Sequence, residues 1–191
     1  MRKPDHPIRL PGRLTDGVVV LDGHRVADAE AHLAGEDEEM LRRFDAPHAS
    51  TLEQTRAAIQ RWIDARSAGG PMIAYAMRRP SGLLLGGCEL RPVAADRIDV
   101  SYWTFPSFRG RGYAGRALAL LCEAAATLDG VRRIEAHIDA DNLASRRVAE
   151  RAGFVERGLV TDEAWSGETS TRVLYTRALG AGRARTLSAG T

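Results

Sequence analysis

Cysteine is scarce in this chain of 191 residues, which contains only Cys88 and Cys122. Each falls inside a segment whose pattern predicts regular structure, and their spacing is not that of a metal-binding pair. A disulfide framework requires more cysteines than two. We therefore interpret both as small core residues and predict that the protein holds no metal.

Long apolar runs are also missing. No apolar run reaches the roughly 18 residues that a membrane span requires. Residues 1–12 (MRKPDHPIRLPG) lack the apolar core of a signal peptide. We therefore expect a cytoplasmic protein with no membrane partner.

An excess of one charge is missing too, because 27 Lys and Arg residues face 25 Asp and Glu residues, for a net charge of +2. So small an excess does not indicate nucleic acid as a partner. The tail 180–191 is small, polar and basic, and we predict that it is disordered rather than RNA-binding. A hydrophobic share of 44% is ordinary for one soluble domain.

What the chain does have is one distinctive stretch, residues 105–121 (FPSFRGRGYAGRALALL). The segment before it, 98–105, carries the β-branched and aromatic residues of a strand and stops at Pro106. From Ala114 onward, small and apolar residues recur at helical spacing. The stretch therefore predicts a strand, a turn and an amphipathic helix over 113–128.

The turn has the chemistry of a pyrophosphate-binding loop. Gly110 and Gly112 have no Cβ, so the backbone can curl closely around a ligand. The turn also presents free N–H groups at a helix N-terminus, where the helix dipole favours an anion. Arg109 and Arg111 add positive charge at the same place.

Two common phosphate-binding motifs are excluded. A Walker loop ends in Gly-Lys-Ser or Gly-Lys-Thr, which does not occur here. Gly110, Gly112 and Gly115 match the spacing of a Rossmann fingerprint, but that fold expects the motif in an early βαβ unit. This turn lies past mid-chain and follows other strand-like segments.

The turn instead resembles the acetyl-CoA loop of the GNAT superfamily of N-acetyltransferases, whose pattern is Arg/Gln-x-x-Gly-x-Gly/Ala. Arg109, Gly112 and Ala114 fit that pattern. The segment from Glu135 to Phe154 is similar to a second motif of the superfamily, Asn-x-x-Ser followed by Glu-x-x-Gly-Phe. Asp99-Val-Ser-Tyr-Trp resembles the corresponding strand of the Rim-type branch, which acetylates α-amino groups, including those of ribosomal proteins.

The resemblance covers residues 17–179 and implies an α/β GNAT fold as a single domain after a flexible arm, 1–16. The implied sheet is mixed and mostly antiparallel, splayed between its fourth and fifth strands, with helices on both faces. The pattern of the residues predicts elements in the matching order. Strands are predicted at 18–21, 72–77, 83–90, 98–105, 133–139, 154–159 and 171–179, and helices at 25–34, 37–44, 51–66, 113–128 and 142–152.

The resemblance also implies roles for the residues that match the motifs. Freed backbone of the fourth strand would hold the pantetheine arm and polarise the thioester, and the turn would hold the pyrophosphate. The implied cofactor-binding residues are Trp103, Thr104, Phe105, Arg109, Gly110, Arg111, Gly112, Tyr113 and Ala114, with Asn142 touching the pantetheine. Asn142 also suits a helix N-cap, which is its structural alternative.

The reaction needs a neutral amine and a proton for the leaving thiolate. Asp99 occupies the place of the family's glutamate and is our candidate base, although its shorter side chain favours action through a water. Glu89 is the reserve, and we interpret His137 as structural. Many family members use a helix tyrosine as the acid, whereas here Ser145 stands at the matching serine position.

We therefore predict an acetyl-CoA-dependent N-acetyltransferase acting on a primary amine, first of all a protein N-terminus or lysine. A small-molecule amine, such as an antibiotic or metabolite, and a catalytically idle acyl-CoA sensor are the alternatives. The acidic cluster 36–39 is interpreted as a solvated helix start. Acceptor choice would depend on loops 36–50 and 160–169, the second containing Trp165, and the protein would be a monomer or homodimer.

Overall fold

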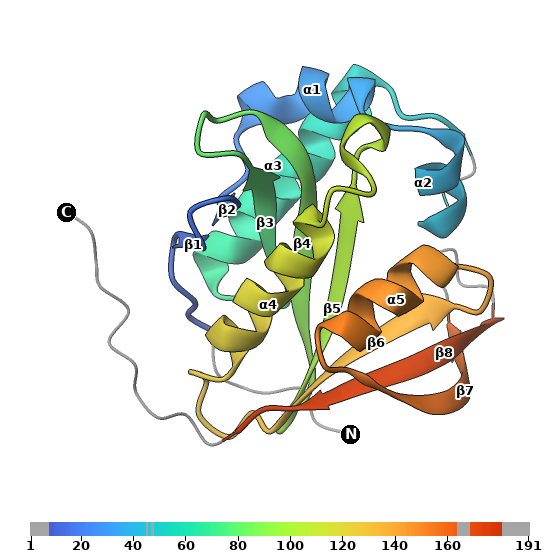
Figure 1. Cartoon of the computed structure of the whole chain (residues 1–191). Coiled ribbons are helices and arrows are strands. Elements are labelled where there is room, and N and C mark those ends of the chain that lie inside the picture. Colours follow the sequence, from blue (N-terminus) through green and yellow to red (C-terminus); the bar gives the residue numbers. More distant parts are fainter. Residues whose placement is uncertain (1–7, 45, 47, 164–168, 181–191) are drawn as a thin grey trace.

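The computed structural model describes residues 8–44, 46, 48–163 and 169–180. Its strands form one eight-stranded sheet in the order β1-β2-β3-β4-β5-β6-β8-β7 (Figure 1). The strands are β1 (Leu14–Thr15), β2 (Val20–Asp22), β3 (Ile73–Arg78), β4 (Leu84–Ala94), β5 (Arg97–Thr104), β6 (Arg133–Asp139), β7 (Val155–Glu163) and β8 (Thr169–Ala178). The helices are η1 (Val26–Asp28), α1 (Ala29–Ala34), α2 (Glu38–Arg43), α3 (Leu52–Ala68), η2 (Pro106–Phe108), α4 (Tyr113–Ala125) and α5 (Leu143–Arg151).

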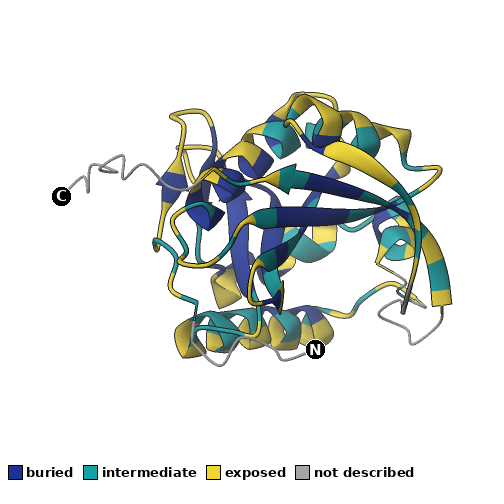
Figure 2. Cartoon of the chain, turned by 90° about the horizontal axis from the view of Figure 1, so that it is seen from below, coloured by how far each residue is buried: buried dark blue, intermediate teal, exposed yellow. Residues whose placement is uncertain are grey.

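The predicted fold class is confirmed. Neighbouring strands of this sheet pair antiparallel, except for β5 and β6, which are parallel. Helices cover both faces: α3 lies behind β3 and β4 in Figure 1, while α4 and α5 lie in front of the sheet. The buried residues gather in the central strands and on the inward sides of the helices (Figure 2).

Most predicted element boundaries are close to the observed ones, with several differences. The short strand β1 lies within the predicted arm 1–16 and was not predicted, β4 continues past the predicted end at 90 to Ala94, and the helix predicted at 113–128 ends at Ala125. The first predicted strand begins later than expected, at Val20, because the Asp16 carboxylate accepts the N–H groups of Val18 and Val19 in a turn. The hairpin of β7 and β8 is longer than predicted because pairing continues to Glu163 opposite Thr169.

Two helix starts form as the sequence indicates. Thr51 and Gln54 make a reciprocal capping box at the start of α3. The Asn142 side chain accepts the Ser145 N–H at 3.0 Å and so caps α5. These caps fix where α3 and α5 begin.

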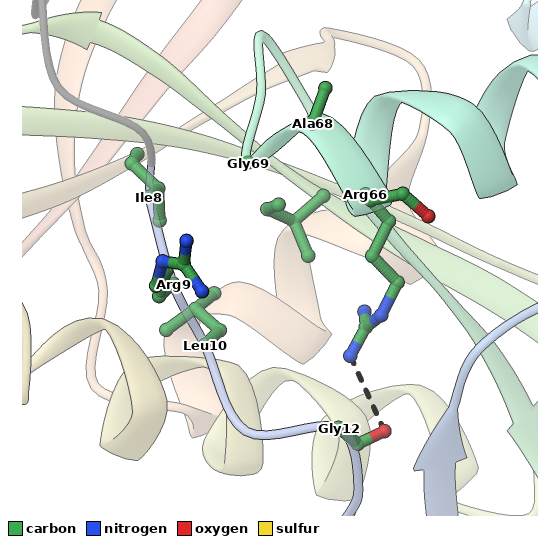
Figure 3. A pocket seen from close by; sticks show the side chains of 9 residues that line it. Ile8, Arg9, Leu10, Gly12, Arg66, Ala68 and Gly69 are labelled. Carbon is green, nitrogen blue, oxygen red and sulfur yellow. Dashed lines mark hydrogen bonds between the residues drawn. The ribbon is translucent and has the colours of Figure 1, made fainter.

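The described part of the predicted arm, from Ile8 onward, lies against the domain. The Ile8 N–H donates to the Gly69 carbonyl at 2.7 Å, and the Arg66 guanidinium donates to the carbonyls of Pro11 and Gly12. These segments border a cavity of about 420 Å³ (Figure 3). The domain limits themselves stay a prediction.

The predicted core position of both cysteines is confirmed, since Cys88 and Cys122 are buried. None of the described helices is both long enough and apolar enough to cross a membrane. Within the same residues, no cluster of His, Cys, Asp and Glu side chains is arranged to hold a metal ion.

Candidate active site

The parallel pair of strands separates after three positions. Pairing runs from Arg97 opposite Arg133 to Asp99 opposite Glu135. Beyond this point β5 continues to Thr104 and β6 to Asp139 without facing each other, and Figure 1 shows the two strands diverging. The expected splay is therefore present, and it leaves backbone groups of β5 free.

The register shows which backbone groups of β5 face the gap. The Phe105 N–H donates to the Leu85 carbonyl of β4 at 2.9 Å. Because alternate residues of a strand direct their backbone groups to opposite sides, Trp103 also faces β4, whereas Tyr102 and Thr104 face the gap. Tyr102 was not among the predicted contacts, although the same alternation could have identified it.

Two glycines of β4 allow β5 to approach this closely. A Cβ on Gly87 would lie 2.3 Å from the Trp103 ring, and one on Gly86 would lie 2.2 Å from the Trp103 carbonyl oxygen. Either distance is too short for a real side chain. Gly86 is thus required by the close approach of the β5 backbone, and Gly87 by the Trp103 ring that lies over it.

The glycine loop has the geometry that an anion needs. Gly110 and Gly112 adopt left-handed backbone conformations, with φ of 73° and 79°. Among the described residues, the N–H groups from Gly110 to Gly115 have no hydrogen-bond partner. A Cβ on either left-handed glycine would meet no atom within 4 Å, so the loop is open to a ligand. These features fit a pyrophosphate group.

The side chains of the loop are used differently from one another. Arg109 directs its guanidinium away from the loop, to Asp37 and to the Thr104 carbonyl. Arg111 is exposed and has no partner among the described residues. The buried Tyr113 accepts hydrogen bonds from Arg79 through its hydroxyl, which anchors the start of α4.

Ser145 contacts a residue that the sequence analysis did not single out. Its hydroxyl donates to the Tyr102 hydroxyl at 2.9 Å, and that phenol donates to the Ser145 carbonyl at 3.1 Å. Burial raises the pKa of Tyr102 to about 12. The pair joins β5 to α5, and Asn142 lies beside it as the cap of the helix.

The two candidate bases occupy different positions. Asp99 lies at the last paired position of β5, and its carboxylate is 3.8 Å from the Arg91 guanidinium. Glu89 stands opposite Ser101, where the strands have already parted. The Ser101 hydroxyl donates to the Glu89 carboxylate at 3.3 Å. Burial raises the pKa of Glu89, and only 8% of the residue is exposed.

On the same face of the sheet as Glu89, aromatic rings pack under α1, α2 and α3. The Trp103 ring lies 5.7 Å from Trp62 and 5.6 Å from Phe44, measured between ring centroids. His24 and His32 join the same cluster, and in the described structure their ring nitrogens have no hydrogen-bond partner. Trp165, the other candidate for this region, lies outside the described residues.

Comparisons with known proteins agree with this geometry. The family model described as an acetyltransferase (GNAT) domain matches residues 19–155. A stretch of 56 residues is 39% identical to an uncharacterised N-acetyltransferase, YycN, of Bacillus subtilis (strain 168), and it spans 29% of this chain and 35% of that protein.

Solved structures share the fold at low sequence identity. RimL, a ribosomal-protein α-N-acetyltransferase solved with coenzyme A, superposes with a TM-score of 0.75 and 20% identity, over 91% of this chain and 99% of RimL. Mycobacterium smegmatis RimJ, solved with a CoA disulfide, has a TM-score of 0.70 and 22% identity, over 93% of this chain and 90% of RimJ. These structures show the fold, and the family model, which matches more than half of the chain, shows that the chain belongs to the GNAT family and is an acetyl-CoA-dependent N-acetyltransferase.

Proposed function

We propose that this enzyme transfers the acetyl group to a primary amine of a protein or peptide. The observation that carries the proposal is the gap between β5 and β6. The glycine loop with its free N–H groups lies at the end of β5, and the buried carboxylate of Glu89 lies beside the gap. Holding two reactants at such a site supplies much of the rate of a transfer reaction.

On the cofactor side, the chain binds through its backbone. The N–H groups from Gly110 to Gly115 and the dipole of α4 would hold the pyrophosphate, with Arg111 adding charge. The freed groups of Tyr102 and the N–H of Thr104 would hydrogen-bond the pantetheine arm, while the Thr104 carbonyl accepts the Arg109 Nε–H. Such contacts would hold the thioester in the gap, where a backbone N–H can polarise its carbonyl.

On the acceptor side, a cavity next to α2 offers one carboxylate, that of Glu38, whose charge no ion pair among the described residues offsets. The other two carboxylates are paired, Asp37 with Arg109 and Glu39 with Arg42 and Arg43. The cavity has a volume of about 530 Å³ and is lined by Asp37, Glu38, Glu39 and Arg42. An amine is mostly protonated at neutral pH, so the Glu38 carboxylate favours its approach. The similar fold of RimL, an enzyme named for a ribosomal-protein substrate, supports a protein amine.

Glu89 is the residue we assign to remove the amine proton, directly or through the Ser101 hydroxyl. A carboxylate whose pKa is raised accepts a proton more readily near neutral pH. Asp99 lies where the strands still pair and near Arg91, so its part would be to orient that arginine.

The Ser145–Tyr102 hydroxyl pair is assigned to the leaving thiolate. A phenol with a pKa of about 12 is a weaker acid than a thiol, whose ordinary pKa is about 8.5. The pair would therefore stabilise the thiolate by a hydrogen bond rather than by complete proton transfer, and for this the Tyr102 O–H would turn from the Ser145 carbonyl to the sulfur. Ser145→Ala should lower kcat while leaving acetyl-CoA affinity nearly intact.

The first test is the melting temperature with and without saturating acetyl-CoA, with ADP as the partial ligand. A ligand at about 100 times its Kd adds about 2.7 kcal/mol, which is roughly 5–10 °C for a domain of this size. Gly112→Val should abolish the shift, because a β-branched residue opposes the left-handed backbone. No shift with the unaltered protein would contradict acetyl-CoA binding at this loop.

The second test assigns the base, using thiol release with a panel of N-terminal peptides. Glu89→Gln should lower kcat/KM by about 100-fold or more, the usual contribution of a general base, and Asp99→Asn by less than about tenfold. The unaltered enzyme should lose activity as the pH falls through the raised pKa of Glu89, and this acid limb should disappear in Glu89→Gln. The reverse ranking of the two variants would restore Asp99 as the base.

A further inference from the structure

Arg109 matches the first position of the cofactor motif, yet its side chain is fully engaged elsewhere. Its two terminal nitrogens donate to the two Asp37 carboxylate oxygens at 2.7 and 2.8 Å. Its Nε donates to the Thr104 carbonyl at 3.1 Å. This is the bidentate geometry in which an arginine binds a carboxylate most firmly.

Asp37 is at the same time the N-cap of α2. Its Oδ1 accepts the Met40 N–H at 3.0 Å, so the same carboxylate accepts hydrogen bonds from the helix backbone and from the arginine. The hydrogen bond from Arg109 is the main reason that the pKa of Asp37 lies below its ordinary value. The start of α2 is thereby tied to the end of β5.

The other end of α2 is tied to the end of β6. Arg43 donates to Asp139 at 2.9 Å and also to Asp141, and Arg42 donates to Asp141 at 2.8 Å. Figure 1 shows α2 beside the end of β5 and above the end of β6. This short helix is therefore attached to both of the strands that part.

Few apolar contacts hold α2 in place, since Met40 is its one buried residue. The attachment of the helix thus depends on its ion pairs. The glycine loop, by contrast, presents six backbone N–H groups, Gly110 to Gly115, and Arg111 without any help from the Arg109 side chain.

We propose that Arg109 and Asp37 are positioning residues that fix α2 to the strand holding the thioester. The inference rests on the proposed function, because α2 borders the acidic cavity assigned to the acceptor amine. Transfer requires the amine within about 3–3.5 Å of the carbonyl, so α2 must keep a fixed position relative to β5. Arg109 fixes that position and is not a ligand of the pyrophosphate.

The test compares acetyl-CoA binding by calorimetry in Asp37→Asn, Arg109→Gln and Arg111→Gln. We expect the Kd of the first two variants to stay within twofold of the unaltered protein, and that of Arg111→Gln to rise several-fold. If Arg109 is instead a phosphate ligand restrained by Asp37, Arg109→Gln weakens binding at least tenfold and Asp37→Asn tightens it. That result would overturn the proposal.

Hydrogen exchange of the α2 amides tests whether the Arg109–Asp37 ion pair holds the helix, and it needs no acceptor substrate. Asp37→Asn and Arg109→Gln should each speed exchange of α2 about tenfold, and the double variant should be no faster than Arg109→Gln. Additive effects, or unchanged exchange, would contradict a shared tie. The exposed Glu123→Gln on α4 is the matched control and should change neither α2 exchange nor acetyl-CoA binding.

Steady-state kinetics of the two variants then distinguish a positioning role from a general effect on folding. With the best peptide of the panel, both variants should lose about tenfold in kcat/KM for the peptide while KM for acetyl-CoA stays within twofold. Equal loss for both substrates would indicate a general structural role and overturn the proposal. Failure of the unaltered protein to bind acetyl-CoA would instead refute the proposed function, and the exchange result would still stand by itself.

Discussion

The helices α4 and α2 flank the candidate site from two sides but are held by different forces. Eight residues of α4 are buried, among them Leu118 and Leu121, and its face packs on β4 and β5. In α2 only Met40 is buried, and its ends are attached by ion pairs. Apolar burial is insensitive to salt, whereas partly exposed ion pairs are screened. The side proposed to bind the cofactor is therefore held more firmly than the side proposed to bind the acceptor.

The largest effect expected from this comparison comes from emptying the packing under α4. Leu118→Ala should lower the free energy of unfolding by about 2–5 kcal/mol, because the fully buried side chain leaves a cavity. Urea denaturation measures the loss. The exposed Glu123→Ala on the same helix should change stability by less than about 0.5 kcal/mol. A loss of unfolding free energy below about 1 kcal/mol in Leu118→Ala would mean that apolar packing does not hold α4 firmly.

The second prediction concerns acid, which should weaken the side of the sheet that carries α1, α2 and α3. Burial lowers the pKa of His24 to about 3 from its ordinary value of 6.5. The folded state thus holds His24 neutral, while the unfolded chain binds a proton below pH 6.5. Above pH 6.5 His24 does not reduce the free energy of unfolding. Below that pH its protonation in the unfolded chain lowers the free energy of unfolding by about 1.4 kcal/mol per pH unit, until the pH approaches 3.

The matched variant for this prediction is His24→Phe, which keeps an aromatic ring against Trp62. Carboxylates also lose their ion pairs in acid, so the informative quantity is the difference between the two proteins. Between pH 6.5 and 4.5, urea unfolding of the unaltered protein should show the steeper loss of stability. Parallel curves would mean that His24 is charged in the folded state.

The same two helices show how much of the site the sequence could predict. The glycine loop and α4 follow from neighbouring residues, because Gly110 and Gly112 and the apolar period of the helix are local signals. By contrast, neighbouring residues do not reveal which distant side chain a residue will pair with. Asp37 lies 72 residues from Arg109, so the sequence pattern predicts the helix start at the acidic cluster but not the arginine that pairs with it.

For the strands, local patterns predicted the elements but not all of their chemistry. Alternation along β5 placed Asp99 and Ser101 on one face, and the same rule would have placed Tyr102 on the other. The Tyr102 hydroxyl could not be paired with Ser145 from the sequence, since the contact depends on how α5 packs across the gap. Likewise, the splay decides that Asp99 lies at the closed end and Glu89 nearer the open part.

The smallest expected effect is on α2 itself. Arg43→Gln removes the side chain that contacts Glu39, Asp139 and Asp141, and it should lower global stability by only about 1 kcal/mol. Amide exchange of α2 should nevertheless become faster, whereas that of α4 should not change. Raising NaCl from 0.05 to 1 M should speed α2 exchange in the unaltered protein, because salt screens the same ion pairs, and should have less effect in Arg43→Gln. If salt accelerates α4 as much as α2, the two helices are held alike, and the side proposed to bind the cofactor is not held more firmly than the side proposed to bind the acceptor.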